Sequence, residues 1–230
     1  MSPDRTSPER APWHRNNTAR APSELGTLIN TTNHLRELEA IYGITLRAHQ
    51  KRQISLYLAL LAKWNRRLNL TTVDQTEEQL RIHFFEPFWA AKRFLPTKAR
   101  VADVGSGAGF PGLAMKLYRP SLELTLIEKN YKKAVFLNTI SDRLNLQVEV
   151  FPGAAEAFLG WKSIEVATLR ALKPSHRLLE RLSDCATNLL LFHGKELDRS
   201  VLTLEVLQQE RVPESKHRYI TLFHLPATPP

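Results

Sequence analysis

The chain has 230 residues, of which 43% are apolar and 24% are charged, and it contains 1 cysteine. This length suits one large domain, or a domain with an added lobe, around a substantial core. The single cysteine excludes a disulfide framework and a cysteine-rich zinc module. No apolar run reaches the roughly 20 residues of a membrane span, and residues 1–22 lack the apolar stretch of a secretory signal. We therefore expect a cytoplasmic protein with no membrane partner.

The charge of the chain is strongly basic and unevenly distributed. A total of 32 Lys and Arg against 23 Asp and Glu gives a net charge of +9, which favours polyanionic partners, nucleic acid first and an anionic membrane second. Between Ile41 and Val73 there is no acid but there are six cations: Arg47, Lys51, Arg52, Lys63, Arg66 and Arg67. This run is either the solvated face of a helix or an RNA-binding surface. We expect residues 1–25 to be a flexible basic tail, with an arginine-rich transit peptide as the alternative.

The first part of the chain has the apolar spacing of helices. This spacing predicts helices over residues 32–42 and 46–68, the second with its cations on the face away from the core. Thr76, followed by acids, begins a third predicted helix that runs towards Phe94 with a break or kink near Pro87. Residues 26–95 are therefore expected to form an N-terminal helical lobe.

After residue 96, short apolar runs alternate with helical patterns. Strands are predicted over residues 101–104, 122–127, 146–151, 164–169, 188–192 and 218–225, and helices over 110–118, 131–144, 154–159, 175–187 and 196–209. This alternation implies an α/β fold, a doubly wound and mostly parallel sheet with helices on both faces. Residues 96–230 are expected to form this second domain.

A glycine-rich segment follows the first predicted strand and precedes a helix. Glycines there let the backbone approach a ligand at the N-terminal end of the helix. Asp103 ends the first strand, and Glu128 ends the next, where an acid can bind two ribose hydroxyls. A tight turn without a ligand is the alternative. We predict a cofactor site made by Asp103, Gly105, Ser106, Gly107, Gly109 and Glu128.

Two cofactors suit this pattern, a nicotinamide dinucleotide and S-adenosylmethionine. The chain has no Tyr-x-x-x-Lys for a dehydrogenase and little length for a catalytic domain after the sheet. The Asp-x-Gly-x-Gly-x-Gly segment that begins at Asp103 resembles the signature of class I adenosylmethionine-dependent methyltransferases, which we favour.

The residue types also restrict the methyl acceptor. Cys185 lies within a predicted helix, where a packing role is more common than a nucleophilic one, and the chain has no Asp-Pro or Asn-Pro of an exocyclic-amine methylase. A ring nitrogen with a free lone pair needs less activation by the protein, and it remains as the candidate methyl acceptor. No His, Cys or Asp cluster has the spacing of metal ligands, so we expect no metal.

Four segments resemble one family, the bacterial 16S ribosomal RNA guanine-N7 methyltransferases first named glucose-inhibited division protein B. They are Lys63-Trp-Asn-Arg-Arg-Leu-Asn-Leu-Thr-Thr-Val73, Arg81-Ile-His-Phe-Phe-Glu86, the loop from Asp103 to Gly112, and Thr168-Leu-Arg-Ala171. They occur in the family's order, and the resemblance extends from about Leu46 to Gly194. It implies methylation of guanine N7 in 16S ribosomal RNA with S-adenosylmethionine as the donor.

The resemblance also implies individual site residues. It places Gly105 and Phe110 against the cofactor, Ala155 and Glu156 beside its adenine, and Arg170 at both the cofactor and the reaction. Glu128, Phe110, Glu86 and His193 stand where the family often has Asp, Leu, Asp and Lys. His83 either orients the substrate or is structural, and Arg170 could instead form a surface salt bridge. The residues expected to bind RNA or substrate are Lys63, Arg66, Arg67, His83 and His193.

The predicted protein is therefore a monomeric RNA methyltransferase whose partner is ribosomal RNA or the small ribosomal subunit. Trp64 has helical spacing and is expected in the core rather than under a base. Two other function classes remain: a small-molecule N- or O-methyltransferase, and a non-catalytic RNA-binding protein on the same fold.

Overall fold

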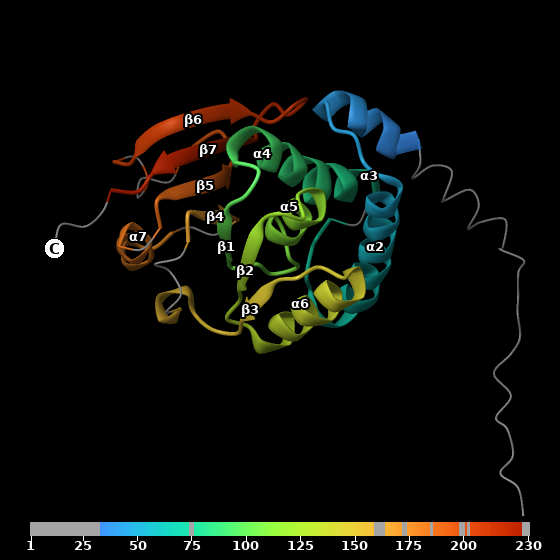
Figure 1. The fold of residues 1–230 in the computed structure, drawn as a ribbon, viewed down its shortest axis with the longest axis horizontal. Helices are drawn as coiled ribbons and strands as arrows, with labels where there is room; N and C mark the ends of the chain where they lie inside the picture. The colour runs from blue at the N-terminus through green and yellow to red at the C-terminus, as the bar shows by residue number, and fades with distance from the viewer. Residues whose placement is uncertain are drawn as a thin grey trace, which may run out of the picture.

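The computed structural model describes residues 33–73, 76–158, 164–171, 174–184, 186–197, 201 and 203–226 (Figure 1). The tail expected over residues 1–25 and the expected packing role of Cys185 lie outside the described residues. Within the described part of the chain, no helix is both long enough and apolar enough to cross a membrane.

The described residues form one seven-stranded sheet in the order β3-β2-β1-β4-β5-β7-β6. Its strands are β1 Arg100–Val104, β2 Glu123–Ile127, β3 Glu149–Phe151, β4 Val166–Arg170, β5 Asn188–His193, β6 Glu205–Arg211 and β7 Tyr219–His224. Strands β1 to β5 are parallel, and β7 lies antiparallel between β5 and β6. The predicted mostly parallel α/β sheet is confirmed.

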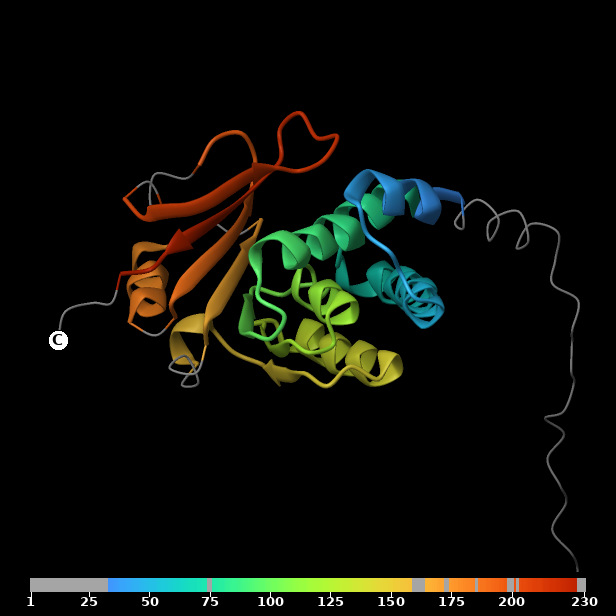
Figure 2. The same cartoon turned by 45° about the horizontal axis from the view of Figure 1, so that its top comes forward.

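Helices cover both faces of this sheet, as predicted. After the helical residues 33–42 come α2 Ala48–Leu68, α3 Thr76–Gln79, the π-helix η1 Leu80–Phe85, α4 Glu86–Phe94, α5 Gly112–Tyr118, α6 Tyr131–Leu144, the 3₁₀ turn η2 Ala155–Ala157 and α7 His176–Ser183. The core on one face contains residues of α2, α4, α5 and α6, and the core on the other contains residues of α7 and η2 (Figure 2).

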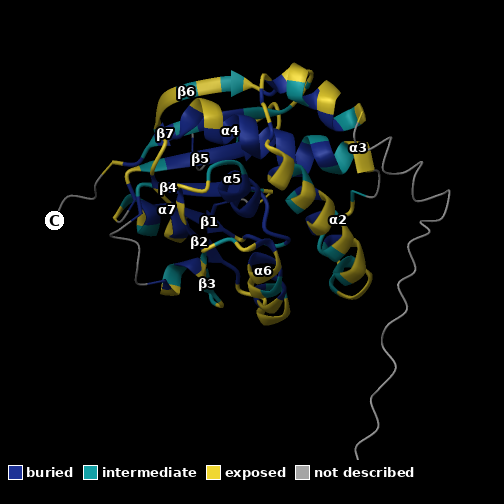
Figure 3. Ribbon diagram, turned by 45° about the vertical axis from the view of Figure 1, so that its right-hand side comes forward, coloured by how far each residue is buried: buried dark blue, intermediate teal, exposed yellow. Residues whose placement is uncertain are grey.

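The strands alternate between these two cores, as the pleat requires. In β1, Val101 belongs to the core under α5, whereas Ala102 and Val104 belong to the core under α7. Figure 3 shows the central strands buried, and yellow exposed residues on β6 and on the outer face of α2. The helices expected as a lobe therefore pack directly on the sheet and share its core.

The helix predicted from Thr76 to Phe94 is continuous, and near Pro87, where a break or kink was expected, it changes from π to α geometry. The chain passes from α3 through η1 into α4, and Pro87 lies in the first turn of α4. In η1 the Glu86 amide bonds to the Arg81 carbonyl, five residues back. A proline has no amide hydrogen to donate, so the start of a new helical segment is where it is tolerated.

The helix predicted over residues 196–209 is wrong. Glu205 to Arg211 form strand β6, which pairs antiparallel with β7. The segment has no clean helical or strand period, and its Val206 and Leu207 are both exposed. Pairing with a strand that follows it in the chain therefore decides its conformation, and local propensity does not.

Candidate active site

The carboxyl ends of the parallel strands meet at one edge of the sheet, and most of the predicted site residues lie there. Strand β1 leads into the glycine loop, β2 into Glu128, β3 towards η2 with Ala155, and β4 ends in Arg170. Strands β1 and β4 are neighbours although β2 and β3 lie between them in the chain. Such a reversal of strand order is where α/β sheets bind their ligands.

Three glycines of the loop adopt left-handed conformations, with φ of 71° at Gly105, 55° at Gly107 and 90° at Gly109. The amides of Gly105 and Ser106 both donate to the Ile127 carbonyl, at 2.8 and 3.1 Å, and so attach the loop to β2. A β-carbon at Gly107 would have only the Gly105 oxygen near it, at 3.8 Å. Gly105 and Gly107 are therefore needed for their conformation, and they leave backbone open to a ligand.

Close packing is the reason for glycine at Gly112 and a second reason, beside its positive φ, at Gly109. A β-carbon at Gly109 would overlap the Tyr57 hydroxyl and lie 2.6 Å from Leu113, and one at Gly112 would lie 2.7 Å from Asp103. A larger residue at Gly112 would displace α5 from β1, and one at Gly109 would collide with Tyr57 of α2 and Leu113 of α5.

Glu128 fixes the loop from the end of β2. Its Oε2 accepts from the Gly107 amide at 2.8 Å, and its Oε1 accepts from the Asn130 amide at 2.8 Å. The residue is 6% exposed. A carboxylate has about four lone-pair positions, so two amides leave acceptor capacity for ribose hydroxyls. The predicted ribose acid thus lies against the predicted loop.

Asp103 lies beneath the loop rather than on its open side. Its Oδ1 accepts from the Thr168 hydroxyl at 2.8 Å and its Oδ2 from the Gly112 amide at 3.1 Å. Burial raises the pKa of this carboxyl to about 6, although both hydrogen bonds oppose the shift. Asp103 therefore ties β1, β4 and the start of α5 together, and direct cofactor contact stays a prediction.

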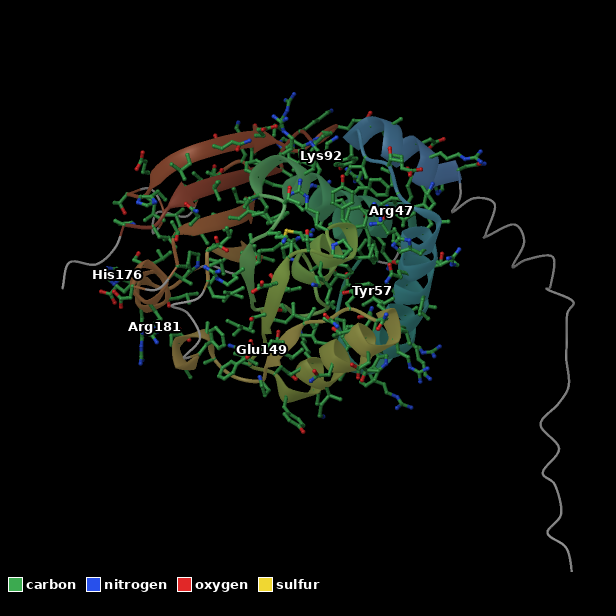
Figure 4. All side chains as sticks on the ribbon, in the orientation of Figure 1. Arg47, Tyr57, Lys92, Glu149, His176 and Arg181 are labelled. Atoms are coloured by element: carbon green, nitrogen blue, oxygen red, sulfur yellow. The ribbon has the colours of Figure 1, made fainter. Side chains whose placement is uncertain are left out.

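Phe110 is sandwiched between two rings from other elements. Tyr57 of α2 stacks on it at a centroid distance of 4.9 Å, and His83 of η1 stacks on it at 4.5 Å with planes only 8° apart. The Tyr57 hydroxyl also donates to the Ala108 carbonyl at 2.7 Å. Tyr57 thus joins α2 to the predicted cofactor loop (Figure 4). Helical spacing in the sequence places Tyr57 on the apolar face of the 46–68 helix, but it does not indicate that Tyr57 reaches the loop.

His83 occupies a structural position. It is 8% exposed, and its Nε2 lies 2.9 Å from the Thr71 hydroxyl. Burial, with a smaller contribution from Arg170, lowers the pKa of His83 to about 3. Its imidazole is therefore neutral near pH 7. This placement supports the structural alternative for His83 over direct orientation of a substrate.

Arg170 lies at the carboxyl end of β4, inside a buried ionic group. Its side chain is 17% exposed, its Nη1 donates to the Ile82 carbonyl at 2.8 Å, and its Nη2 lies 3.9 Å from the Glu86 carboxylate. The same carboxylate pairs with Arg218 at 2.8 Å. Burial raises the pKa of Glu86, whereas both arginines act to lower it. The salt bridge considered for Arg170 exists, but it is buried rather than on the surface.

The sequence did not indicate that Arg218 is a partner of Glu86, because Arg218 is not part of any recognisable local motif. It precedes β7, far along the chain from Glu86, and only the sheet topology brings the two together. The burial and charge of Glu86 imply that it needs a cationic partner, but not which one.

His193 and the η2 residues lie at the same edge of the sheet but at the ends of strands that are well apart: η2 follows β3, His193 ends β5, and β2, β1 and β4 lie between these strands. His193 ends β5, with Nδ1 2.6 Å from the Gly194 carbonyl and Nε2 2.8 Å from the Thr221 hydroxyl. Ala155 is buried in η2 after β3, and Glu156 beside it is half-buried. The structure therefore places Ala155 and Glu156 on the β3 side of the loop and His193 on the far side of β4.

The predicted RNA-binding cations lie at the C-terminal end of α2 rather than at the loop. Lys63, Arg66 and Arg67 line a hollow of about 380 Å³ together with Trp64 and Leu68. Trp64 is half-buried and packs against Phe136 of α6 at 5.6 Å, so it is both a core residue and a wall of the hollow.

Asn65 holds the chain segment that follows α2. Its amide nitrogen donates to the Thr71 carbonyl, and its amide oxygen accepts from the Thr71 amide, both at 2.9 Å. Asn69 ends α2 in the left-handed conformation with φ of 46°. Asn65 thus pins the loop after the helix, and Asn69 lets the chain turn into it. Among the described residues, no group of three or more His, Cys, Asp or Glu side chains could hold a metal ion.

The fold and site together define a class I adenosylmethionine-dependent methyltransferase. The parallel sheet ends in an antiparallel strand, a glycine loop follows β1, and an acid follows β2. Residues 50–214 match the family model described as rRNA small subunit methyltransferase G, and the chain belongs to this family. The family predicted from the sequence is confirmed.

Relatives with this name share a substantial part of the chain. The chain is 38% identical over 157 residues to ribosomal RNA small subunit methyltransferase G of Aquifex aeolicus, covering 65% of this chain and 79% of the relative. It is 31% identical over 205 residues to the protein of the same name from Streptococcus equi subsp. zooepidemicus, covering 78% and 85%.

Solved structures share the fold at low sequence identity. A SAM-dependent methyltransferase from Aquifex aeolicus superposes with a TM-score of 0.55 at 18% identity, over 68% of this chain and 97% of that one. TrmK of M. capricolum, in complex with S-adenosylhomocysteine, gives a TM-score of 0.51 at 14% identity, over 64% and 70%.

Proposed function

We propose that the protein transfers the methyl group of S-adenosylmethionine to N7 of a guanine in 16S ribosomal RNA. Membership of the rRNA small subunit methyltransferase G family supports the reaction class. The observation that carries the cofactor half is the contact between Glu128 and Gly107, because it joins the acid after β2 to the loop after β1 at the reversal of strand order. At this point a carboxylate that can bind ribose hydroxyls lies beside a loop whose backbone is accessible to the rest of a nucleoside.

The residues at this edge fit S-adenosylmethionine. Gly105 is exposed with a positive φ, and a β-carbon at Gly107 would meet only the Gly105 oxygen, at 3.8 Å, so the loop can bring its backbone against a ligand. Glu128 would hold the ribose, and the turn at Ala155 and Glu156 would lie beside the adenine. When bound, the cofactor supplies a methyl group activated by a positively charged sulfur.

The acceptor nitrogen sets what the protein must contribute. Guanine N7 carries a lone pair and no proton, so methyl transfer to it needs no general base. The buried and neutral His83 agrees with this requirement, since its pKa of about 3 leaves it no role as a proton acceptor near pH 7. The contribution of the chain is then positioning and exclusion of water, which together can supply several kcal/mol.

Positioning is divided between two groups of residues. Asp103, Glu128 and Tyr57 fix the loop that holds the cofactor. Arg170 is proposed to orient the target base, because its guanidinium lies at the end of β4, next to the strand that carries the loop. The base must leave its stack or already be unpaired to reach this edge.

Ribosomal RNA or the small ribosomal subunit is the proposed partner, which would place the reaction in the cytoplasm. That the chain acts as a monomer stays a prediction, and size-exclusion chromatography with light scattering would test it.

The experiment is methyl transfer from S-adenosylmethionine labelled in its methyl group. Separate transcripts of small-subunit and large-subunit ribosomal RNA serve as acceptors. We expect label in the small-subunit RNA alone. Cofactor binding by calorimetry without transfer to any RNA would favour a small-molecule methyltransferase, and no cofactor binding would favour a non-catalytic RNA-binding protein.

A further inference from the structure

The N-terminal end of α6 presents an unusual side chain to solvent. Tyr131, the first residue of α6, is 72% exposed although its ring is large and apolar. Lys129 and Lys132 flank it and are also exposed, and Lys133 follows. Exposed aromatic rings among cations are what single-stranded nucleic-acid sites use, because a base stacks on the ring while the cations meet phosphates.

The neighbouring helix brings further cations to the same end. Helix α2 packs against α6 in the opposite direction, with the Gln53 amide bonded to the Leu144 carbonyl at 2.7 Å near one end and Trp64 against Phe136 further along. Figures 1 and 3 show the two helices side by side. The end of α2 that carries Lys63, Arg66 and Arg67 therefore lies beside the beginning of α6.

The positive charge at this end of the helix pair is not neutralised by any nearby acidic residue that the structure describes. Neither Ile41–Val73 nor Lys129–Ser141 contains an acid. In the described part of the chain no ion pair involves Lys63, Arg66, Arg67, Lys129 or Lys132. By contrast, Lys51 near the opposite end of α2 is paired with Glu39 at 2.6 Å. Among the described residues, cations without an ion pair are thus more numerous at this end, while Arg52 and Arg143 remain as such cations near the opposite ends of the two helices.

The position of this surface relative to the reaction is favourable. Tyr131 comes three residues after Glu128, whose carboxylate is bonded to the Gly107 amide of the cofactor loop. The carboxylate of Glu128 also bonds to the Asn130 amide, so the segment that leads into α6 is fixed to the site. An RNA strand held there would have its nucleotides close to the methyl donor.

We propose that the adjoining ends of α2 and α6 form one surface for a single-stranded segment of the substrate RNA. Tyr131 stacks on a base of that segment, Lys129 and Lys132 contact its phosphates from α6, and Lys63, Arg66 and Arg67 contact them from α2. The surface rests on the proposed function in taking ribosomal RNA as the substrate. It adds α6, and a stacking residue, to the cations recognised in the sequence.

The first test separates charge from stacking. A small-subunit ribosomal RNA transcript is titrated with each variant across a salt series. Lys129→Gln/Lys132→Gln should flatten the log–log salt dependence by about 1.4, because each phosphate contact to a single strand contributes about 0.7. Tyr131→Ala should weaken binding at least about fivefold with an unchanged slope, because stacking involves no counterion release. Tyr131→Phe keeps the ring and should bind within about twofold of wild type.

A matched control removes two charges from the opposite ends of the same helices. Arg52→Gln/Arg143→Gln alters exposed residues of α2 and α6 and should leave the salt slope as in wild type. A labelled single-stranded oligoribonucleotide and its duplex form a second comparison. Tyr131→Ala should weaken binding of the single strand more than that of the duplex, whose bases are already stacked.

The outcomes distinguish this surface from the proposed function. Wild-type protein that methylates the transcript, with binding unchanged in Tyr131→Ala and Lys129→Gln/Lys132→Gln, overturns the surface but leaves the function intact. The expected binding losses without methyl transfer by wild type would keep the surface and overturn the function. Binding to anionic phosphatidylglycerol vesicles instead of RNA would overturn both.

Discussion

The Tyr57 hydroxyl of α2 donates a 2.7 Å hydrogen bond to the Ala108 carbonyl, in the middle of the loop proposed to hold the cofactor. Both groups are buried, and the Tyr57 ring also stacks on Phe110 of the same loop. Burial raises the pKa of Tyr57 well above its usual value, so its hydroxyl stays a donor. The N-terminal helices therefore shape the cofactor site as well as carrying the basic surface.

Replacing Tyr57 by Phe tests this contact. The ring stack remains, but the Ala108 carbonyl loses its donor, and an unsatisfied buried acceptor costs about 1–3 kcal/mol. We expect affinity for S-adenosylmethionine to fall at least about fivefold in calorimetry, with the fold retained. Tyr42→Phe is the control, since Tyr42 is also buried but its hydroxyl has no hydrogen-bond partner within the described residues. Equal affinities in the two variants would contradict the assigned role of Tyr57.

Glu128→Ala should weaken cofactor binding by about 1–3 kcal/mol, because hydroxyls lose a charged acceptor and the Gly107 amide loses its anchor. Glu123→Ala removes an exposed acid from the other end of the same strand and should bind the cofactor as wild type does. The measurement is calorimetric titration of both folded variants. A wild-type affinity in Glu128→Ala would remove this residue from the site.

Arg170→Ala should lower both stability and turnover. From its position at a strand end, the sequence suggested that losing Arg170 would affect turnover only. The buried ion pair with Glu86 shows that Arg170 also contributes to the stability of the fold. Losing one partner of a buried ion pair costs about 3–5 kcal/mol, and the remaining Arg218 should reduce this cost. Urea unfolding gives the stability, and methyl transfer at a temperature where the variant is fully folded gives the activity. Full activity under those conditions would assign Arg170 a purely structural role.

His83 should make the protein sensitive to acid. Its pKa is lowered in the folded state, from 6.5 to about 3, so the unfolded state binds the proton more readily. The stability from neutral His83 is therefore present above pH 6.5 and is lost as the pH falls towards 3. Between pH 6.5 and about 5 the loss from this group should be about 2 kcal/mol. His83→Gln should show a correspondingly shallower fall in its free energy of unfolding, and an unchanged slope would contradict the assignment.

Features that depend on local pattern could be predicted from the sequence. The glycine loop, Glu128 and the alternation of strands and helices follow from residue types at short spacing, and the fold class followed from them. Strand β6 could not be predicted, because its conformation depends on pairing with β7 and its own pattern is ambiguous.

The partners of individual residues were equally beyond local pattern. Helical spacing indicated that Tyr57 faces inward, but not that it reaches Ala108. Likewise, only the assembled sheet brings Arg218 to Glu86 and His83 onto Phe110. The charge of the basic residues was enough to predict a nucleic-acid partner. That Tyr131 is exposed among them could be learned only from the structure.

The most direct test of the central claim is whether the methyl group is transferred to guanine N7. Small-subunit ribosomal RNA is transcribed either with ordinary guanosine or with 7-deazaguanosine, which has carbon in place of N7 and otherwise pairs normally. Both transcripts are incubated with the protein and labelled S-adenosylmethionine, digested to nucleosides and separated by mass spectrometry. The proposed function predicts 7-methylguanosine from the ordinary transcript and no label in the 7-deaza transcript. A different methylated nucleoside, or equal labelling of both transcripts, would contradict it.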